Sequence, residues 1–322
     1  MCIRDRLSVL TLSVAALAVS AQTPSTVYFT SEISPEALVR IFKALGVEPK
    51  GRVAVKISTG ESTESNQLNP TLIADLVKSV DGTLVECNTA YPGNRYETAD
   101  HRRAIAEHGY DKIAVVDIMD EEGSMPLPMQ DTTYFKENLV GSHLANYDFL
   151  INLAYFKGHA MGGFGGVLKN QSIGVASREG KARIHSGGLS DLPKDAFMTP
   201  RGGQDGFLES MAGAAQSVDT YFKGKNGIVY IDVMNNMSVD CDCNGHPAKP
   251  VLKDMGILAS LDPVALDKAC LDLVFNHQAT DGDDNGPLME RINSRHGTHT
   301  VDYADKIGLG TMNYVIVSLD EQ

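Results

Sequence analysis

The segment 155–185 constrains this chain most, and it reads YFKGHAMGGFGGVLKNQSIGVASREGKARIH. It combines glycines with lysines, arginines and two histidines. Glycine permits positive φ and lets a ligand approach the main chain closely. Successive N–H groups in such turns form anion-binding concavities, and the start of a following helix adds its dipole. We therefore expect the functional site here. The alternative is a flexible glycine loop that carries solvated charges.

The charged and imidazole side chains of this segment are candidates for binding and catalysis. Histidine titrates near neutral pH and can serve as acid, base or metal ligand, so His159 and His185 are candidate catalytic residues. Lys169 is expected to hold an anion and to take part in catalysis. A carboxylate or phosphate would also contact cationic side chains and the glycine backbone. The candidate binding residues are Lys157, Gly165, Gly166, Asn170, Lys181 and, from a polar turn upstream, Arg95.

The overall charge narrows the class of partner. The 322 residues carry 28 lysines and arginines against 41 aspartates and glutamates, a net charge of −13. Nucleic-acid binding needs a basic face, so this balance argues against nucleic acid as a partner. The expected partner is a small anionic molecule bound by a local cationic cluster. The sequence leaves the oligomeric state open.

Residues 1–21 have the pattern of a secretory signal peptide. Arg4 and Arg6 precede an apolar run over residues 7–19, and small residues suit cleavage before Gln22. A membrane-spanning helix needs roughly 20 apolar residues, so the run is short for a stable anchor. We therefore expect a periplasmic or secreted protein.

The cysteines that follow this segment are Cys87, Cys241, Cys243 and Cys270. In an oxidising compartment they could form two disulfides. However, the spacing of Cys241 and Cys243 is too tight for an easy disulfide, and the two resemble a chelating pair. They are the candidate metal ligands, with Cys270 as a third candidate and burial as its alternative. The expected cofactor is a metal ion or an iron–sulfur centre, and its identity stays open.

Alternation of apolar strands with helices predicts an α/β fold, with a largely parallel or mixed sheet flanked by helices. Residues 22–322 form one domain, which a seam at 121–132 could divide into lobes 22–122 and 133–322. The expected helices are 35–45, 69–80, 98–108, 206–222 and 263–275, and the expected strands are 52–58, 83–87, 112–118, 148–156, 227–233 and 314–319. Polar segments 88–95, 157–169 and 235–243 follow three of these strands, where ligands bind in such sheets.

Several familiar motifs are absent. Leu168 stands where a dinucleotide fingerprint needs its third glycine, and Ala182 where a Walker loop needs Ser or Thr. The acidic run from Asp281 resembles a calcium loop, but Ile292 occupies the position of its final carboxylate. The remaining histidines lie in polar segments typical of a protein surface, and we expect them to have no role in catalysis. They are His101, His108, His296 and His299.

Three strings resemble the family known as domain of unknown function 362 (DUF362). They are NTAYPGNRYETADHRRAIAEHGY, the glycine-rich segment, and DCDCNGHPAKPVLKDMGILASLDPVALDKACLDLV. Many members of that family carry a ferredoxin-like insert with four cysteines after the position of His185. Residues 187–203 contain no cysteine here, so the resemblance implies a version without the iron–sulfur module.

A more distant resemblance is to the nickel-pincer lactate racemases. Their order of histidine, glycine-rich turn, lysine and later histidine is similar to His159, Gly165-Gly166, Lys169 and His185. The resemblance implies that the lysine holds a cofactor and that the histidines serve metal and acid–base roles.

The function expected from these observations is an exported, metal-dependent enzyme acting on a small anion. Redox chemistry or racemase-like chemistry would fit its thiols and histidines. The alternative is a non-catalytic periplasmic protein that binds a small anion. Such a binder would need the lysines and glycines but not the thiols.

Overall fold

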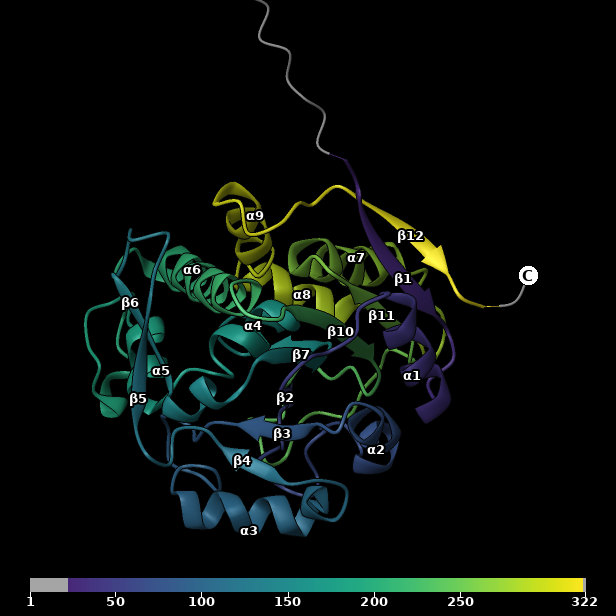
Figure 1. The fold of residues 1–322 in the computed structure, drawn as a ribbon. Coiled ribbons are helices and arrows are strands. Elements are labelled where there is room, and N and C mark those ends of the chain that lie inside the picture. The colour runs from purple at the N-terminus through teal and green to yellow at the C-terminus, as the bar shows by residue number, and fades with distance from the viewer. Residues whose placement is uncertain (1–22, 321–322) are drawn as a thin grey trace, which may run out of the picture.

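One eight-stranded sheet organises residues 23–320, the part of the chain that the computed structural model describes (Figure 1). Its strand order is β12-β1-β11-β10-β7-β2-β3-β4. Strands β10, β7, β2, β3 and β4 run parallel, whereas β11 is antiparallel to both of its neighbours. The predicted α/β fold with a mixed sheet is confirmed. The strands are β1 (Ser25–Thr30), β2 (Val53–Lys56), β3 (Thr83–Glu86), β4 (Val116–Ile118), β7 (Phe149–Tyr155), β10 (Ile228–Met234), β11 (Gly256–Ser260) and β12 (Tyr314–Ser318).

Helices cover both faces of the sheet, and each face has its own apolar core. Alternate residues of a strand point to opposite faces, so in β7 Ile151 joins one core and Leu150 the other. The core that contains Ile151 takes apolar side chains from α1 (Pro35–Ala44), α2 (Pro70–Ser79) and α3 (Thr98–His108). The core that contains Leu150 takes them from α4 (Val167–Ser172), α6 (Gly203–Lys223), α7 (Pro263–Asn276), α8 (Gly286–Ser294) and α9 (His299–Lys306).

Local signals in the sequence set the helix ends. The Ser34 side chain accepts the N–H of Ala37 at the start of α1, as an N-cap does. Asn69 caps α2, whose first residue is Pro70. Gly109 ends α3 in the left-handed conformation at φ 83°, which glycine adopts without steric cost. These three ends were predicted from the sequence and are confirmed.

Other segments differ from the prediction. The strand expected over 112–118 begins only at Val116, because residues 110–112 form a 3-10 turn. The seam at 121–132 contains β5 (Ser124–Pro128), which pairs with β6 (Glu137–Gly141). The sheet takes strands from both 22–122 and 133–322. Two short strands, β8 (Lys157–His159) and β9 (Gly163–Gly165), fold the glycine-rich segment into a hairpin that leads through α4 to α5 (Arg178–His185).

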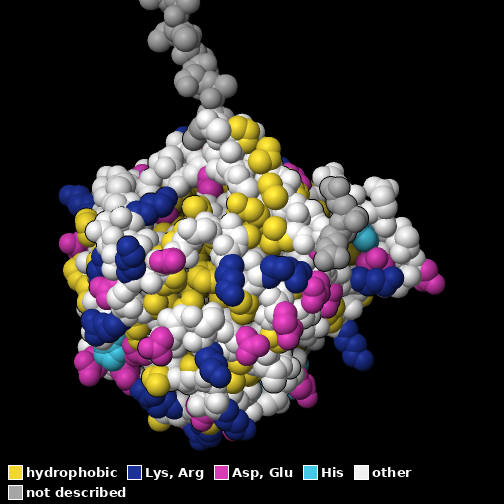
Figure 2. Space-filling view, turned by 45° about the vertical axis from the view of Figure 1, so that its right-hand side comes forward, with side chains coloured by type: hydrophobic (Ala, Val, Ile, Leu, Met, Phe, Trp, Pro, Cys, Tyr) yellow, Lys and Arg dark blue, Asp and Glu magenta, His cyan; other side chains and the backbone are white. Residues whose placement is uncertain are grey.

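The β12 edge of the sheet carries apolar side chains on the surface. Val315, Ile316 and Val317 are 40–47% exposed, and Figure 2 brings this side of the molecule forward. Among residues 23–320 no helix is long and apolar enough to cross a membrane. The predicted signal peptide at 1–21 lies outside the described residues.

The chain reverses its direction of travel through the sheet between β2 and β7. Strands β3 and β4 lie on one side of β2, whereas β7 and β10 lie on the other. The connections that leave β2 and β7 therefore diverge, and a crevice opens beyond their carboxyl ends. The segments after Lys56 and Tyr155 border this crevice.

A buried carboxylate fixes the start of α4, the helix that overlies this crevice. Asp267 of α7 accepts the N–H of Val167 at 2.8 Å and that of Leu168 at 3.0 Å. Asp267 therefore occupies the first two N–H groups of this helix, and the contribution of the helix dipole to anion binding stays a prediction. Gly166 precedes the helix, and a Cβ there would lie 2.4 Å from Asp267 Oδ1.

We predict that Gly166→Ala destabilises the protein by about 1–3 kcal/mol, because the added methyl group overpacks the contact with Asp267. Gly224→Ala is the matched control, since a Cβ at that helix end meets only atoms at 3.4 Å or beyond. Its effect should stay within about 0.5 kcal/mol. Urea denaturation of both variants measures the difference. Equal stabilities would show that Gly166 is not required for close packing.

Candidate functional site

A cavity of about 230 Å³ occupies the crevice beyond β2 and β7. All nine residues predicted for catalysis or substrate binding line it, and so does Cys243. The structure thus brings together side chains from the loop before α3, the β8–β9 hairpin, α4 and α5. Their chemical roles stay predictions. The nine are Arg95, Lys157, His159, Gly165, Gly166, Lys169, Asn170, Lys181 and His185.

The lining of the cavity is rich in positive charge. Five cationic side chains face it against two carboxylates, Glu86 and Asp242. In an apolar surrounding such charges attract an anion more strongly than they would in water. The local excess therefore supports binding of a small anion, although the whole chain is acidic. The cations are Lys56, Arg95, Lys157, Lys169 and Lys181.

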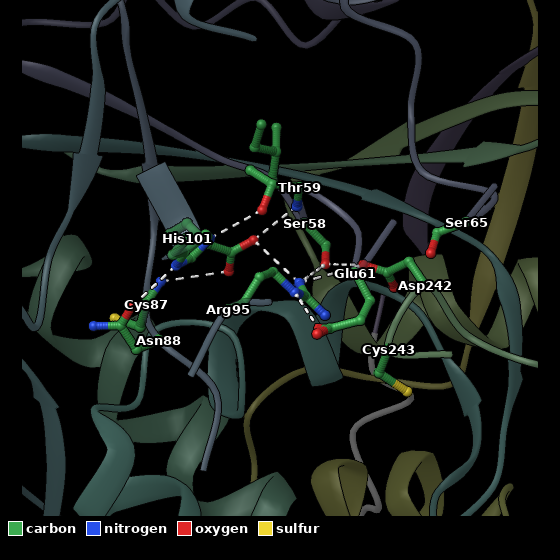
Figure 3. A network of polar contacts seen from close by, with 12 residues as sticks. Ser58, Thr59, Glu61, Ser65, Cys87, Asn88, Arg95, His101, Asp242 and Cys243 are labelled. Atoms are coloured by element: carbon green, nitrogen blue, oxygen red, sulfur yellow. Dashed lines mark hydrogen bonds and ion pairs between the residues drawn. The ribbon is translucent and has the colours of Figure 1, made fainter. Parts of the chain in front are cut away.

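Asp242 is the carboxylate that contacts cationic side chains from two different parts of the cavity wall (Figure 3). Its oxygens lie 3.6 Å from Arg95 Nη1 and 3.7 Å from Lys157 Nζ, and Ser58 donates a hydrogen bond to it. Burial alone would raise the pKa of Asp242, but Lys157, Arg95 and Lys169 together hold it well below the usual range. Asp242 is therefore ionised, and it fixes the positions of two cations.

Lys56 and Glu86 form a second buried pair, which the sequence prediction missed. Lys56 Nζ lies 2.9 Å from Glu86 Oε1 and 3.2 Å from Asn170 Oδ1. Both charged residues end apolar parallel strands, and a lone charge in such a strand is a usable signal for a site. Asn170 also donates to Lys56 O and Asn152 Oδ1, so its amide links α4 to β2 and β7, and its predicted role in binding a ligand stays a prediction.

Lys169 differs from the other cations of the cavity. Among residues 23–320 no hydrogen bond or ion pair to its amine is found, whereas Lys56, Lys157, Lys181 and Arg95 all have partners. Burial lowers the pKa of Lys169 to about 7, and the charge of Lys157 lowers it further against the opposing effect of Asp242. The Lys169 amine therefore loses its proton much more readily than an ordinary lysine does.

Both cavity histidines are neutral. Burial, with help from Lys169, lowers the pKa of His185 to about 3 and that of His159 well below its usual value. His159 Nδ1 accepts the N–H groups of Gly162 at 2.8 Å and Met161 at 3.3 Å. Because Nδ1 is an acceptor, the neutral ring carries its proton on Nε2. His185 stacks on Phe207 with ring centroids 5.1 Å apart.

The glycines of the hairpin give space rather than unusual backbone angles at the cavity. A Cβ on Gly165 would lie 3.2 Å from Lys157 Cε and 3.3 Å from Lys169 Cδ. The two lysine stems thus pack against the bare main chain. Only Gly163 in the hairpin has positive φ, at 80°. The groups that approach Gly165 and Gly166 closely are side chains of the protein itself, and approach of a ligand to their main chain stays a prediction.

Cys241 and Cys243 are joined in a disulfide, so the expectation that they avoid bonding to each other is wrong. Their sulfurs and one ring nitrogen of His159 lie within 4.8 Å of one another. This set does not fit a metal as it stands. Metals bind thiolates, which a disulfide lacks, and of the two His159 ring nitrogens Nδ1 already accepts two N–H groups.

Cys270 lies on α7 and is not part of that group. Burial raises the pKa of its thiol well above the usual value, with Asp232 and Asp267 adding to the effect. Burial raises the pKa of Cys87 in the same way, so this cavity residue is a protonated thiol rather than a nucleophile. A second group with metal-ligand spacing, Asp117, Glu121 and His143, lies half-exposed away from the cavity.

One histidine treated as a surface bystander is buried. His101 bonds Thr59 Oγ1 at 3.0 Å and Asn88 Oδ1 at 3.0 Å beside Glu86, in the network of Figure 3. The surface interpretation of His101 is therefore wrong. His296 and His299 are paired with Asp205 and Glu209 away from the cavity.

A family model described as "Domain of unknown function (DUF362)" matches residues 53–272. No curated protein matches the sequence. Two solved structures are similar in fold: the lactate racemase apoprotein from Thermoanaerobacterium thermosaccharolyticum and a structural-genomics protein from Thermotoga maritima. The first is 16% identical with a TM-score of 0.40, and the match covers 66% of this chain and 51% of that one. The second is 12% identical with a TM-score of 0.42, covering 74% and 57%.

This chain thus spans about half the length of those two solved structures. At these TM-scores neither likeness assigns a function to it.

The lowered pKa of Lys169 predicts a pH-dependent gain in stability from Lys169→Met. Between about pH 7 and the ordinary lysine value near 10.4, the unfolded chain binds more protons than the folded one, so the stability of the wild type rises with pH. The methionine variant lacks this contribution. The free energy of unfolding of Lys169→Met should exceed that of the wild type most at pH 7. This difference should shrink by about 1.4 kcal/mol per pH unit towards pH 10.

Urea denaturation at several pH values measures this difference, with Lys249→Met as the control because Lys249 is exposed. An advantage of Lys169→Met that does not change with pH would contradict a neutral Lys169.

The disulfide predicts which cysteines react with an alkylating reagent in unreduced, denatured protein. Cys87 and Cys270 should be labelled directly, because they are free thiols. Cys241 and Cys243 should be labelled only after reduction. Peptide mapping by mass spectrometry separates the two pairs. Labelling of Cys241 and Cys243 before reduction would restore them as candidate thiolate ligands.

Proposed function

The chain belongs to the family described as domain of unknown function (DUF362), and on this premise we propose that it is an enzyme. It would bind a small carboxylate or related anion in the cavity beyond β2 and β7, and it would transfer a proton at a carbon beside a carboxylate or carbonyl group of that anion. The family description names no reaction. The proposal therefore depends on the cavity itself.

The observation that carries the proposal is the amine of Lys169. It lines the cavity, has no bonded partner within residues 23–320, and has a pKa near 7. A general base works best when its pKa lies near the working pH, and a desolvated lysine reaches that range. A protein that only bound an anion would gain more from a fully charged lysine.

Two other lysines are placed to hold the anion. The ion pair of Lys157 with Asp242 spans 3.7 Å, which is longer than a hydrogen bond, and Lys157 Nζ also lies 3.4 Å from the centroid of the Tyr155 ring, so its remaining donors can reach an anion. Lys181 donates one hydrogen to Ala176 O at 2.6 Å and keeps two others. Arg95 contributes charge but uses its donors on Glu61, Ser58 and Tyr91.

His159 supplies a neutral donor. Its Nε2–H is fixed by the two main-chain bonds to Nδ1. A neutral imidazole N–H can polarise a carbonyl or carboxylate oxygen without taking part in charge repulsion with the lysines. Polarisation by His159 and proton removal by Lys169 would together release a hydrogen from the carbon attached to that carbonyl or carboxylate carbon.

A second proposal is the metal-dependent or redox enzyme expected from the sequence. Reduction of the disulfide would release two thiols within 4.8 Å of a His159 nitrogen, a set of soft ligands. Export is proposed as well. It rests on the pattern of residues 1–21, and the Cys241–Cys243 disulfide fits an oxidising compartment. The non-catalytic binding protein remains the alternative to both enzymes.

The proposal predicts exchange of hydrogen for deuterium at a carbon beside a carboxylate or carbonyl group of a bound ligand. Proton NMR in deuterium oxide, with a panel of small hydroxy and oxo acids, measures the exchange. Lys169→Met should abolish exchange, whereas Lys249→Met should leave it unchanged because Lys249 is exposed outside the cavity. Saturable binding of the panel without exchange would favour the non-catalytic binding protein.

A further inference from the structure

We infer that Lys169 is a nucleophile, and that it forms an imine with the carbonyl carbon of a small 2-oxo acid. The inference rests on the proposed function and names the substrate class of the same cavity, an acid whose exchangeable hydrogens lie on the carbon beside its carbonyl group. In it, Lys169 promotes the proton transfer by forming the imine, which makes those hydrogens more acidic, instead of removing the proton itself. The inference starts from the contrast between Lys169 and its neighbours. Each other cation of the cavity is held by a carboxylate or a carbonyl oxygen, whereas the Lys169 amine, within residues 23–320, is not.

The position of Lys169 is fixed although its amine is free. It lies on α4, whose first two N–H groups bond Asp267 and whose Asn170 bonds Asn152. Its Cδ would lie only 3.3 Å from a Cβ on Gly165, so the stem runs along the bare main chain. The side chain is partly exposed and lines the cavity. A substrate in the cavity therefore meets the amine directly.

The neighbourhood also keeps the amine nucleophilic. Only a neutral amine attacks a carbonyl, and burial followed by the charge of Lys157 lowers the pKa of Lys169 to about 7. A lysine placed in a desolvated pocket beside another cation is the arrangement that activates this side chain for imine formation. Asp242 neutralises Lys157 and Arg95 and has no ion pair with Lys169.

The other residues that line the cavity, and its volume, indicate which kind of acid fits. Lys157 and Lys181 face the cavity with free donors for a carboxylate, while other parts of the lining are apolar. A volume of about 230 Å³ admits only a short chain. A carboxylate beside a carbonyl, followed by a small apolar tail, matches these three features. The apolar residues are Ala90, Ala160, Met161, Ile173 and Phe197.

The step balances with water as the only other product. The neutral Lys169 Nζ attacks the carbonyl carbon, a C–N bond forms, and the proton that the nitrogen loses moves to the carbonyl oxygen to give a carbinolamine. A second proton, taken from solvent, lets the C–O bond break, and water leaves. The neutral ring of His159 would offer its Nε2–H to that oxygen as a hydrogen-bond donor, because its Nδ1 is held by two main-chain bonds. The protonated imine that remains contains one proton taken up from solvent.

Reductive trapping tests the inference. Sodium cyanoborohydride reduces an imine to a stable amine, so the full chain treated with pyruvate should gain the mass of one reduced pyruvyl group. Peptide mapping should place it on Lys169. Lys169→Arg keeps a positive charge but cannot form the imine, so it should lose the adduct. Lys249→Arg, the matched change at an exposed lysine, should keep it.

The pH dependence of trapping in the wild type tests the inference even if Lys169→Arg does not fold. The rate of trapping should rise with pH around 7, following the neutral fraction of the amine. In Lys157→Met the midpoint should move to higher pH, because the neighbouring charge that lowers the pKa of Lys169 is gone. A pH profile of trapping without this midpoint would overturn the inference.

Binding and trapping separate the inference from the proposed function. Saturable binding of pyruvate by calorimetry with no adduct, or with the adduct on another lysine, would overturn the imine and leave the proton-transfer enzyme standing. If no short 2-oxo acid of a panel binds or forms an adduct, the inference is overturned. The absence of hydrogen exchange would contradict the proposed function separately.

Discussion

The ionised carboxylate of Asp242 is the feature on which the cavity depends. It follows β10, and it lies 3.6 Å from Arg95, which follows β3, and 3.7 Å from Lys157, which follows β7. Bringing these charges out of water costs several kcal/mol for each ion, and removing one partner of a buried pair typically costs about 3–5 kcal/mol. Such an arrangement persists because Ser58, Glu61 and Glu86 complete the network. The cost suggests that the cluster serves binding rather than stability.

Much of the fold was predictable because its signals are local. Ser34, Asn69 and Gly109 mark helix ends through their own side chains or backbone freedom. The parallel strands are apolar runs because helices cover both faces. Strand β1 was missed, and its partners Ser260 and Tyr314 lie more than 230 residues further along the chain. Pairing over such a distance leaves no pattern inside a short window.

The site was predictable in part, for the same reason. Glycines, lysines and histidines of 157–185 are close in sequence, and the prediction that polar segments meet beyond strand ends needs only the parallel sheet. Lys56 and Glu86 were missed because the lone charge in each strand was not used as a signal, and because their pairing joins two different strands. The role of Asp267 depends on contact between α7 and α4, which the sequence does not encode locally. The Cys241–Cys243 disulfide contradicted a spacing argument.

The distribution of carboxylates explains why one lysine differs from the rest. Glu86 bonds Lys56, and Asp242 lies between Arg95 and Lys157, so no carboxylate lining the cavity remains for Lys169 among the described residues. A carboxylate partner for Lys169 would raise its pKa, and each cation that lines the cavity would then be paired and unreactive. Leaving it unpaired beside a charged lysine keeps an amine that loses its proton near pH 7. The same network that holds the anion-binding cations in place therefore also makes the chemistry of Lys169 available.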